Sequence, residues 1–170
     1  MLLVVRDNTS HHTFLFSIMG TRSRIGIEMP DHSVVSVYCH WDGYPEWTGK
    51  QLVEYYQNRE DVQELIDGGS MSSLRTEHLW VTAAVRDENG KIVEDEKGNW
   101  IYSPTRDPQP LYHTERGEEL NVDHTSFDEF VSGNSGEEYA YLYDLNDNWK
   151  AFKIGYGPVE RVEIPNYVTA

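Results

Sequence analysis

The chain has a single cysteine, Cys39, among its 170 residues, so it cannot form an internal disulfide. Such low cysteine use is typical of reducing compartments, and we expect a cytoplasmic protein. No apolar run approaches the roughly 20 residues that a membrane-spanning helix needs, so a membrane is not an expected partner. The start of the chain holds two short apolar patches divided by polar residues, which is a poor match to a signal peptide.

Basic residues are also scarce. The sequence has 14 Lys and Arg against 29 Asp and Glu, for a formal net charge of -15. A surface of this charge repels nucleic-acid phosphates and attracts basic proteins, so no nucleic acid is expected as a partner. The acidic excess lies between Arg86 and Asp147, where sixteen acidic residues accompany five Lys or Arg. This segment is either a solvated face or a partner-binding surface, and for the second the candidate residues are Glu94, Asp95, Glu96, Glu118 and Glu119.

Alternating apolar and polar residues predict two hairpins. The segments 24–29 and 33–41 alternate in this way, and Pro30 and Asp31 favour a turn between them. The second strand should carry Val35, Val37 and Cys39 on one face and Val34, Ser36, Tyr38 and His40 on the other. The second hairpin is predicted at 137–157, where Tyr139, Tyr141 and Tyr143 share a face.

Short helices are expected around these hairpins. Thr48 is a suitable N-cap for one helix, a second at 60–67 ends at the pair Gly68–Gly69, and a third at 125–133 is capped by Thr125 or Ser126. Turns are also predicted at Asn89–Gly90 and Lys97–Gly98, and we expect no internal repeat. The sequence therefore predicts an α+β fold: a mainly antiparallel sheet with two or three short helices packed on it.

Two motif-like stretches do not have the spacing that their chemistry requires. GYPEWTGK at 43–50 has five residues between its glycines where a phosphate-binding P-loop has four, and Gln51 replaces the Ser or Thr that would bind magnesium. DLNDNWKAFKIG at 144–155 has Trp149 and Gly155 where a calcium loop needs glycine and glutamate, so a hairpin turn explains it better. The histidines and the cysteine show no zinc spacing, so we expect no metal and no cofactor.

The stretch YCHWDGYP at 38–45 concentrates reactive side chains. Cys39 and His40 are neighbours on a strand, so their side chains point to opposite faces and cannot form a nucleophile–base pair. Cys39 is predicted to be a buried core residue. A catalytic role is less favoured, because as a nucleophile Cys39 would need a distant base such as His78, His113 or His124.

His40 and Asp42 could instead meet each other and an arginine of the paired strand, Arg22 or Arg24. Two interpretations follow from this grouping. Arg22, His40 and Asp42 are the catalytic residues of a small enzyme, or they form a polar network that closes the corner between strand and helix.

Four segments together resemble a family of small proteins encoded by tailed bacteriophages: MGTRSRIGIE, YCHWDGYPEWTGKQLVEYY, YHTERGEEL and EEYAYLYDLNDNWKAF. The family pattern combines a G-T-R start, Y-x-H-W-D-G-Y-P with a glycine four residues later, an R-G-E and a late E-Y-x-Y. The resemblance covers about residues 19–155. The residues on the pattern are Gly20, Thr21, Arg22, His40, Trp41, Asp42, Gly43, Tyr44, Pro45, Gly49, Arg116, Gly117 and Glu118.

The family pattern begins at a methionine equivalent to Met19. Residues 1–18 are therefore expected to be an extension, either an extra strand or the product of an upstream start codon, and 19–170 a single domain. The resemblance implies a viral protein in the host cytoplasm and no specific activity.

Two classes of function remain open. The first is an acidic phage accessory protein that binds the basic surface of a host or bacterial defence protein without catalysis, with DNA mimicry as its sharpest form. The alternative is a small hydrolase or transferase that uses Arg22, His40 and Asp42. A structural virion component finds no support, because the sequence has no coiled coil and no fibre-like composition.

Overall fold

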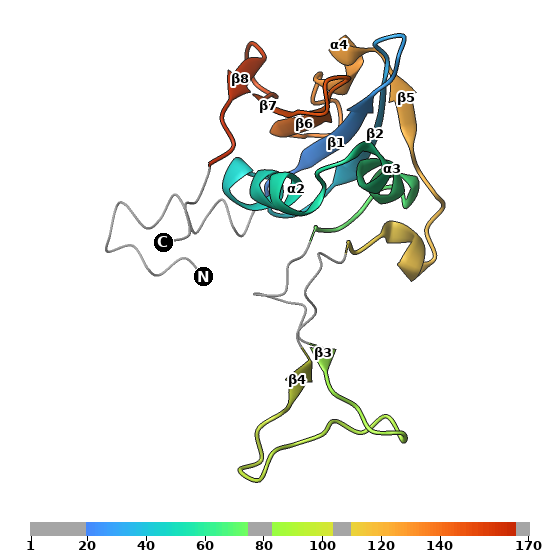
Figure 1. The fold of residues 1–170 in the computed structure, drawn as a ribbon, viewed down its shortest axis with the longest axis vertical. Helices are drawn as coiled ribbons and strands as arrows, with labels where there is room; N and C mark the ends of the chain where they lie inside the picture. Colours follow the sequence, from blue (N-terminus) through green and yellow to red (C-terminus); the bar gives the residue numbers. More distant parts are fainter. Residues whose placement is uncertain (1–19, 75–82, 104–109, 166–170) are drawn as a thin grey trace, which may run out of the picture.

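The computed structural model describes residues 20–74, 83–103 and 110–165 (Figure 1). The expected N-terminal extension, 1–18, and the candidate base His78 lie outside these ranges. The first half of the chain forms β1 (Ser23–Glu28), β2 (Val34–Cys39), the π-helical turn η1 (Pro45–Gly49), α2 (Lys50–Tyr55), α3 (Arg59–Asp67) and β3 (Ala83–Ala84). The second half forms β4 (Tyr102–Ser103), the 3-10 helix η2 (His113–Arg116), β5 (Asp123–Thr125), α4 (Phe127–Phe130), β6 (Tyr139–Tyr143), β7 (Trp149–Lys153) and β8 (Glu160–Val162).

A six-stranded sheet in the order β5-β2-β1-β6-β7-β8 is the centre of the fold. Every neighbouring pair is antiparallel except β1 and β6, which are parallel. The hairpin predicted at 24–29 and 33–41 is present as β1 and β2, and the late tyrosine-rich hairpin as β6 and β7. The expected α+β fold with a mainly antiparallel sheet is therefore confirmed.

Helices α2 and α3 cover one face of the sheet (Figure 1). The alternation of the strands sends their apolar side chains to this face, as predicted. The buried cluster beneath the helices includes Ile25, Ile27, Val37, Cys39, Leu52, Leu65, Ile66, Tyr141 and Tyr143. Asn58 begins α3, because its side-chain oxygen accepts a hydrogen bond from the amide of Asp61 at 2.9 Å.

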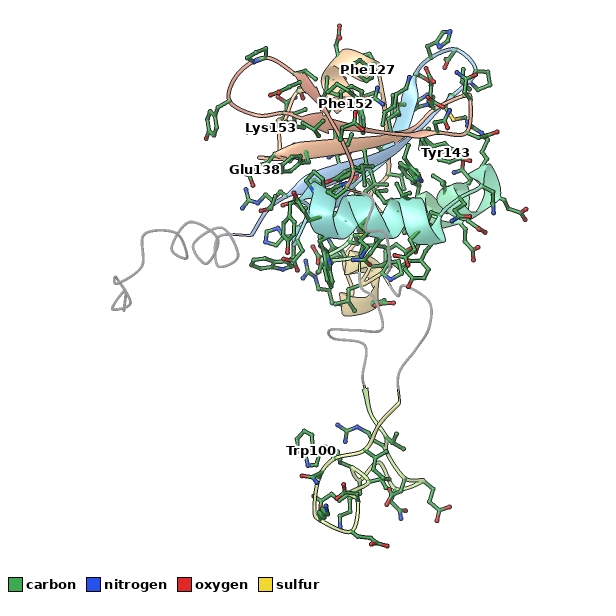
Figure 2. The ribbon with its side chains drawn as sticks, turned by 60° about the vertical axis from the view of Figure 1, so that its left-hand side comes forward. Trp100, Phe127, Glu138, Tyr143, Phe152 and Lys153 are labelled. Atoms are coloured by element: carbon green, nitrogen blue, oxygen red, sulfur yellow. The ribbon has the colours of Figure 1, made fainter. Side chains whose placement is uncertain are left out.

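The opposite face has a smaller apolar cluster at one end only. There α4 packs Phe130 against Val34 and Leu142, and Phe127 meets Phe152 with ring centroids 5.4 Å apart (Figure 2). Ser126 begins α4 as its N-cap, which is one of the two expected residues. The other end of this face carries polar side chains instead, and we call it the open face: Arg22, Arg24, Ser36, Tyr38 and His40.

The expected role of Thr48 as an N-cap is wrong. The helical segment begins earlier, at Pro45, whose fixed φ suits the first helical position and whose missing N–H is not needed there. Thr48 lies inside this first turn, and its hydroxyl donates to the carbonyl oxygen of Asp42 at 2.7 Å. Thr48 thus ties the helix to the end of β2.

Residues 83–103 form a separate small hairpin that contains the same turn twice. The carboxylate of Asp87 accepts the amides of Asn89 and Lys91, each at 2.9 Å. Eight positions later Asp95 accepts the amides of Lys97 and Asn99 at 2.8 and 2.9 Å. The expectation of no internal repeat is therefore wrong, since VRDENGKI and VEDEKGNW are two copies of one turn-forming unit.

Backbone hydrogen bonds close this hairpin into a three-sided unit, which we call the acidic hairpin (residues 85–101). The amide of Val85 donates to the carbonyl of Ile101, that of Ile101 to Val93, and that of Val93 to Val85, at 2.8 to 3.0 Å. Val85, Val93 and Ile101 are thus joined in a ring of three hydrogen bonds. One aspartate turn lies between Val85 and Val93 in the sequence, and the other lies between Val93 and Ile101.

Candidate functional site

The register of β1 and β2 builds the open face. Arg24 lies directly opposite Tyr38 in the antiparallel pair, so both side chains leave the sheet on the same side. The same alternation places Arg22 and His40, one step beyond each strand, on that side as well. The parallel partner β6 begins next to Arg22, whose carbonyl accepts the amide of Glu138 at 2.8 Å.

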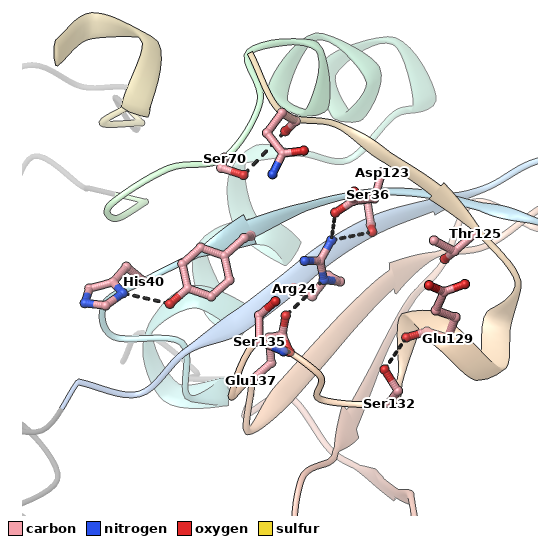
Figure 3. A network of polar contacts seen from close by, with 12 residues as sticks. Arg24, Ser36, His40, Ser70, Asp123, Thr125, Glu129, Ser132, Ser135 and Glu137 are labelled. Atoms are coloured by element: carbon pink, nitrogen blue, oxygen red, sulfur yellow. Dashed lines mark hydrogen bonds and ion pairs between the residues drawn. The ribbon is translucent and has the colours of Figure 1, made fainter. Parts of the chain in front are cut away.

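Tyr38 and His40 are in direct contact on this face (Figure 3). The Tyr38 hydroxyl oxygen lies 2.7 Å from Nδ1 of His40. The positive charge of Arg22 acts on this hydroxyl and on the His40 ring. The three side chains therefore lie near one another at the ends of two strands.

A loop distant in sequence brings His113 to the same place. The amide of Met71 donates to the Tyr38 carbonyl at 2.8 Å, which continues the sheet edge beyond β2. The amide of His113 then donates to the carbonyl of Ser70 at 2.9 Å. As a result the His113 ring lies 6.5 Å from that of Tyr38, measured between centroids.

The electrostatic environment of His40 reflects this arrangement. Burial lowers the pKa of His40, and the positive charges of Arg22, His113 and Arg116 lower it further. Burial also raises the pKa of Tyr38. His40 is therefore neutral near pH 7 and Tyr38 keeps its proton, so the Tyr38 hydroxyl can donate to Nδ1.

Arg24 forms a second polar network on the open face (Figure 3). Its Nη1 donates to the carboxylate of Asp123 at 2.6 Å and to the Ser36 hydroxyl at 3.1 Å. Its Nε donates to the carboxylate of Glu137 at 3.2 Å, and Glu137 also accepts the amide of Ser135 at 3.0 Å. Arg24 thus fastens the edge strand β5 and the loop before β6 to the centre of the sheet.

The structure brings Arg22 and His40 together, but it does not place Asp42 with them. Asp42 has φ 56°, a left-handed conformation that turns the chain at the end of β2. Burial raises its pKa, and its charge acts on Cys39 and Tyr44, while no hydrogen bond or ion pair within the described residues joins its carboxylate to Arg22 or His40. A catalytic group of Arg22, His40 and Asp42 is therefore not assembled in this conformation.

Cys39 is a core residue, as predicted. It is fully buried under α2 and α3, and this burial raises the pKa of its thiol to about 12. Of the candidate bases, His113 is on the open face, and His124 is bound at 2.6 Å to the Ser33 hydroxyl on the β1–β2 turn. Neither can serve Cys39 as a base.

The candidate partner-binding carboxylates occupy two places. Glu94, Asp95 and Glu96 lie on the acidic hairpin, and all are exposed. Glu118 and Glu119 follow η2 at the rim of the open face, where Glu118 pairs with Arg116. Asp95 differs from its neighbours, because its carboxylate is occupied by the backbone of its own turn and the Asn99 amides lower its pKa.

Tyr38, His113 and Arg116 are site residues that the proposed trio lacked. The strand alternation already put Tyr38 beside His40, and that signal was available in the sequence. For His113 the sequence suggests only the role of a distant base for Cys39. Its place on the open face depends on the pairing of residues 70–73 with 110–113, which no local pattern reveals.

No family model, no curated protein and no solved structure matches this chain. Among residues 20–74, 83–103 and 110–165, no three His, Cys, Asp or Glu side chains are grouped so as to hold a metal ion. The helices found in these same ranges are all too short or too polar to cross a membrane.

Proposed function

We propose that this chain is an acidic accessory protein of a tailed bacteriophage that binds a basic host or defence protein without catalysis, in the host cytoplasm. The observation that carries the proposal is the exposure of Trp100 on the acidic hairpin, where its side chain is 51% exposed (Figure 2). A tryptophan gains free energy by leaving water, so an exposed one within a charged segment favours a contact surface.

The surroundings of Trp100 suit a basic partner. Glu88, Glu94 and Glu96 are exposed on the same hairpin, and the next residue after Trp100, Ile101, is 41% exposed. The two aspartate turns fix the backbone, which lowers the entropy lost on binding. An apolar anchor within a rim of carboxylates matches a partner pocket bordered by Lys and Arg.

The viral origin rests on the resemblance to the phage family, and the binding mode on this hairpin. DNA mimicry is the narrower form, in which the carboxylates take the place of backbone phosphates. The small hydrolase or transferase is the second candidate, favoured by the nearness of Arg22, whose charge lowers the pKa of His40. We rank it second because no hydrogen bond or ion pair within the described ranges joins Asp42 to either residue.

The test compares binding of host proteins by the wild type and by matched variants. We expect Trp100→Ala, and separately the triple change Glu88→Gln, Glu94→Gln and Glu96→Gln, to lose a protein that the wild type retains. The triple change should also flatten the salt dependence of the remaining affinity. Asp87 and Asp95 stay unchanged, because their carboxylates hold the turns.

Two controls match these variants. Tyr156→Ala removes an aromatic residue that is even more exposed, in the loop between β7 and β8, and Glu54→Gln, Glu64→Gln and Glu160→Gln remove three exposed charges elsewhere. Both controls should keep the partner. If the hairpin variants and the controls retain the same proteins, the hairpin is not the binding surface. A partner displaced by duplex DNA would support mimicry.

A further inference from the structure

Hydrogen-bond donors and positive charge converge at one place on this acidic protein. Arg22, Tyr38 and His113 line an open groove of about 890 Å³ over the ends of β1 and β2. They come from three separate segments: the residue before β1, the end of β2 and the start of η2. Arg116 is close enough for its charge to act on His40.

The carboxylates at this groove are mostly engaged with other cations. Three carboxylates line it: Asp123 pairs with Arg24, Glu118 pairs with Arg116, and Glu119 is exposed to solvent. In contrast, no ion pair joins Arg22 to any carboxylate within the described ranges. Arg22 is thus a cation at the groove that still lacks an anionic partner there.

The orientation of Tyr38 and His40 adds a further donor. When the Tyr38 hydroxyl donates to Nδ1 of His40 across 2.7 Å, the proton of the neutral imidazole is on Nε2. The positive charge of Arg22 also acts on the Tyr38 hydroxyl. An oxyanion in the groove can accept from the Arg22 guanidinium and the His113 ring, the two of these donors that line it.

We propose that the groove lined by Arg22, Tyr38 and His113, with His40 bonded to Tyr38, binds a phosphate-type oxyanion, either free phosphate or the phosphoryl group of a small molecule. A guanidinium matches phosphate oxygens with two parallel hydrogen bonds, and phosphate has enough oxygens to meet the imidazole donors as well. A bound dianion would also balance the charge of Arg22, which no ion pair within the described ranges neutralises. This site is independent of the acidic hairpin, so either proposal can fail without the other.

The test is a titration of the full chain followed by its amide NMR signals. The probes are inorganic phosphate, glycerol 3-phosphate and acetate, with chloride holding the ionic strength constant. We expect saturable shifts at residues 22, 38, 40 and 113 with the two phosphates. If glycerol 3-phosphate binds more tightly than inorganic phosphate, the ligand is the phosphoryl group of a small molecule. If the two bind equally, the ligand is free phosphate. Acetate binding as tightly as phosphate, or no saturable shift at these residues, would overturn the proposal.

Variants make the test specific. Arg22→Gln should weaken phosphate binding about tenfold or more, the size expected for loss of a charged hydrogen-bond donor. Arg161→Gln is the matched control, because Arg161, in β8, stacks on the ring of Phe152 and does not line the groove. Equal weakening in the two variants would mean nonspecific charge attraction and overturn the proposal. If Arg22→Gln does not fold, Tyr38→Phe decides, since it removes only one hydroxyl and should still reduce the affinity severalfold.

Discussion

Nδ1 of His40 lies 2.7 Å from the hydroxyl of Tyr38, while Cys39 between them points the other way into the core. Strand alternation thus divides YCHWDGYP into two chemically separate sides. The Tyr38 and His40 side is polar, with Tyr38 and Arg22 lining one groove, and the Cys39 side is sealed under α2 and α3. This division decides which substitutions should affect binding and which should affect stability.

Replacing His40 should change how stability depends on pH. Burial, and then the charges of Arg22, His113 and Arg116, lower the pKa of His40 below its usual 6.5. Below pH 6.5 the unfolded chain therefore binds a proton at this residue that the folded chain does not, so folding loses stability as the pH falls. Above pH 6.5 both states are neutral and the loss vanishes. His40→Gln should flatten the fall in melting temperature between about pH 6.5 and pH 5.

The groups that face His40 also affect its pKa. Tyr38 is uncharged in this range and Glu118 is paired with Arg116, so burial is the main cause of the lowered pKa and the neighbouring cations add to it, Arg22 first. His124→Gln, on the edge strand β5, controls for the loss of any imidazole. An identical pH slope in wild type and His40→Gln would contradict the prediction.

Removing Glu137 should destabilise the fold strongly. Its side chain is 2% exposed and accepts hydrogen bonds from Arg24 and the Ser135 amide. Glu137→Ala leaves a half-compensated guanidinium and an unpaired amide, which should lower the free energy of unfolding by about 3 kcal/mol. Glu137→Gln keeps an acceptor of the same shape and should cost less. Urea unfolding measures both.

The neighbouring Glu138 gives the control for this pair. Glu138 precedes the same strand but is less buried, so Glu138→Ala should change the free energy of unfolding by less than about 1 kcal/mol. Equal losses for Glu137→Ala and Glu138→Ala would show that the Arg24 network contributes little.

Local patterns predicted the elements whose signals lie within a few residues. The alternation of β2 assigned Val37 and Cys39 to the core correctly, and the Gly68–Gly69 stop gave the end of α3. Such features depend on period and on turn chemistry, which a single segment contains. The octapeptide repeat of the acidic hairpin was equally local, and its Asp-x-x-Gly spacing was a visible signal that was overlooked.

These local patterns could not predict which strands pair when they are far apart in the sequence. The parallel contact between β1 and β6 places Glu137 beside Arg24, 113 positions away in sequence. Asp42 illustrates another limit: its spacing to His40 suggested proximity, but the chain turns there with a positive φ, and no hydrogen bond or ion pair within the described residues joins Asp42 to His40 or Arg22. Nothing in the residue type alone requires that conformation, although Asp tolerates it better than most residues.

Cys39 should be chemically inert in the folded protein. Burial raises the pKa of its thiol to about 12, so almost no thiolate exists at pH 8. A thiol-reactive disulfide reagent should therefore modify Cys39 only as the chain unfolds, and added urea should speed the reaction in step with unfolding. Cys39→Ala should cost about 1 kcal/mol and leave partner or phosphate binding unchanged. Rapid modification of the native protein would contradict the assignment.

The turn at Asp144 repeats the geometry of the acidic hairpin inside the main sheet, and this makes it testable by comparison. Its carboxylate accepts the amides of Asn146 and Asn148 at 2.9 and 3.0 Å and pairs with Lys150 at 3.1 Å. Burial raises the pKa of Asp144, but these bonds outweigh burial and the pKa lies below its usual 3.8. A lowered pKa adds stability above about pH 4 that is lost as the pH falls through the folded-state value.

Asp144→Asn should therefore lower the free energy of unfolding by about 2 kcal/mol at pH 7, because two amides and Lys150 lose their anionic acceptor. The difference from wild type should shrink as the pH falls below 3.8, where the wild-type carboxylate also loses its charge. Asp95→Asn changes the same turn in the acidic hairpin and should leave the main melting transition in place, since β3 and β4 form their own sheet. A constant difference between Asp144→Asn and wild type from pH 7 to pH 3 would show that the charge of Asp144 is not what stabilises the turn.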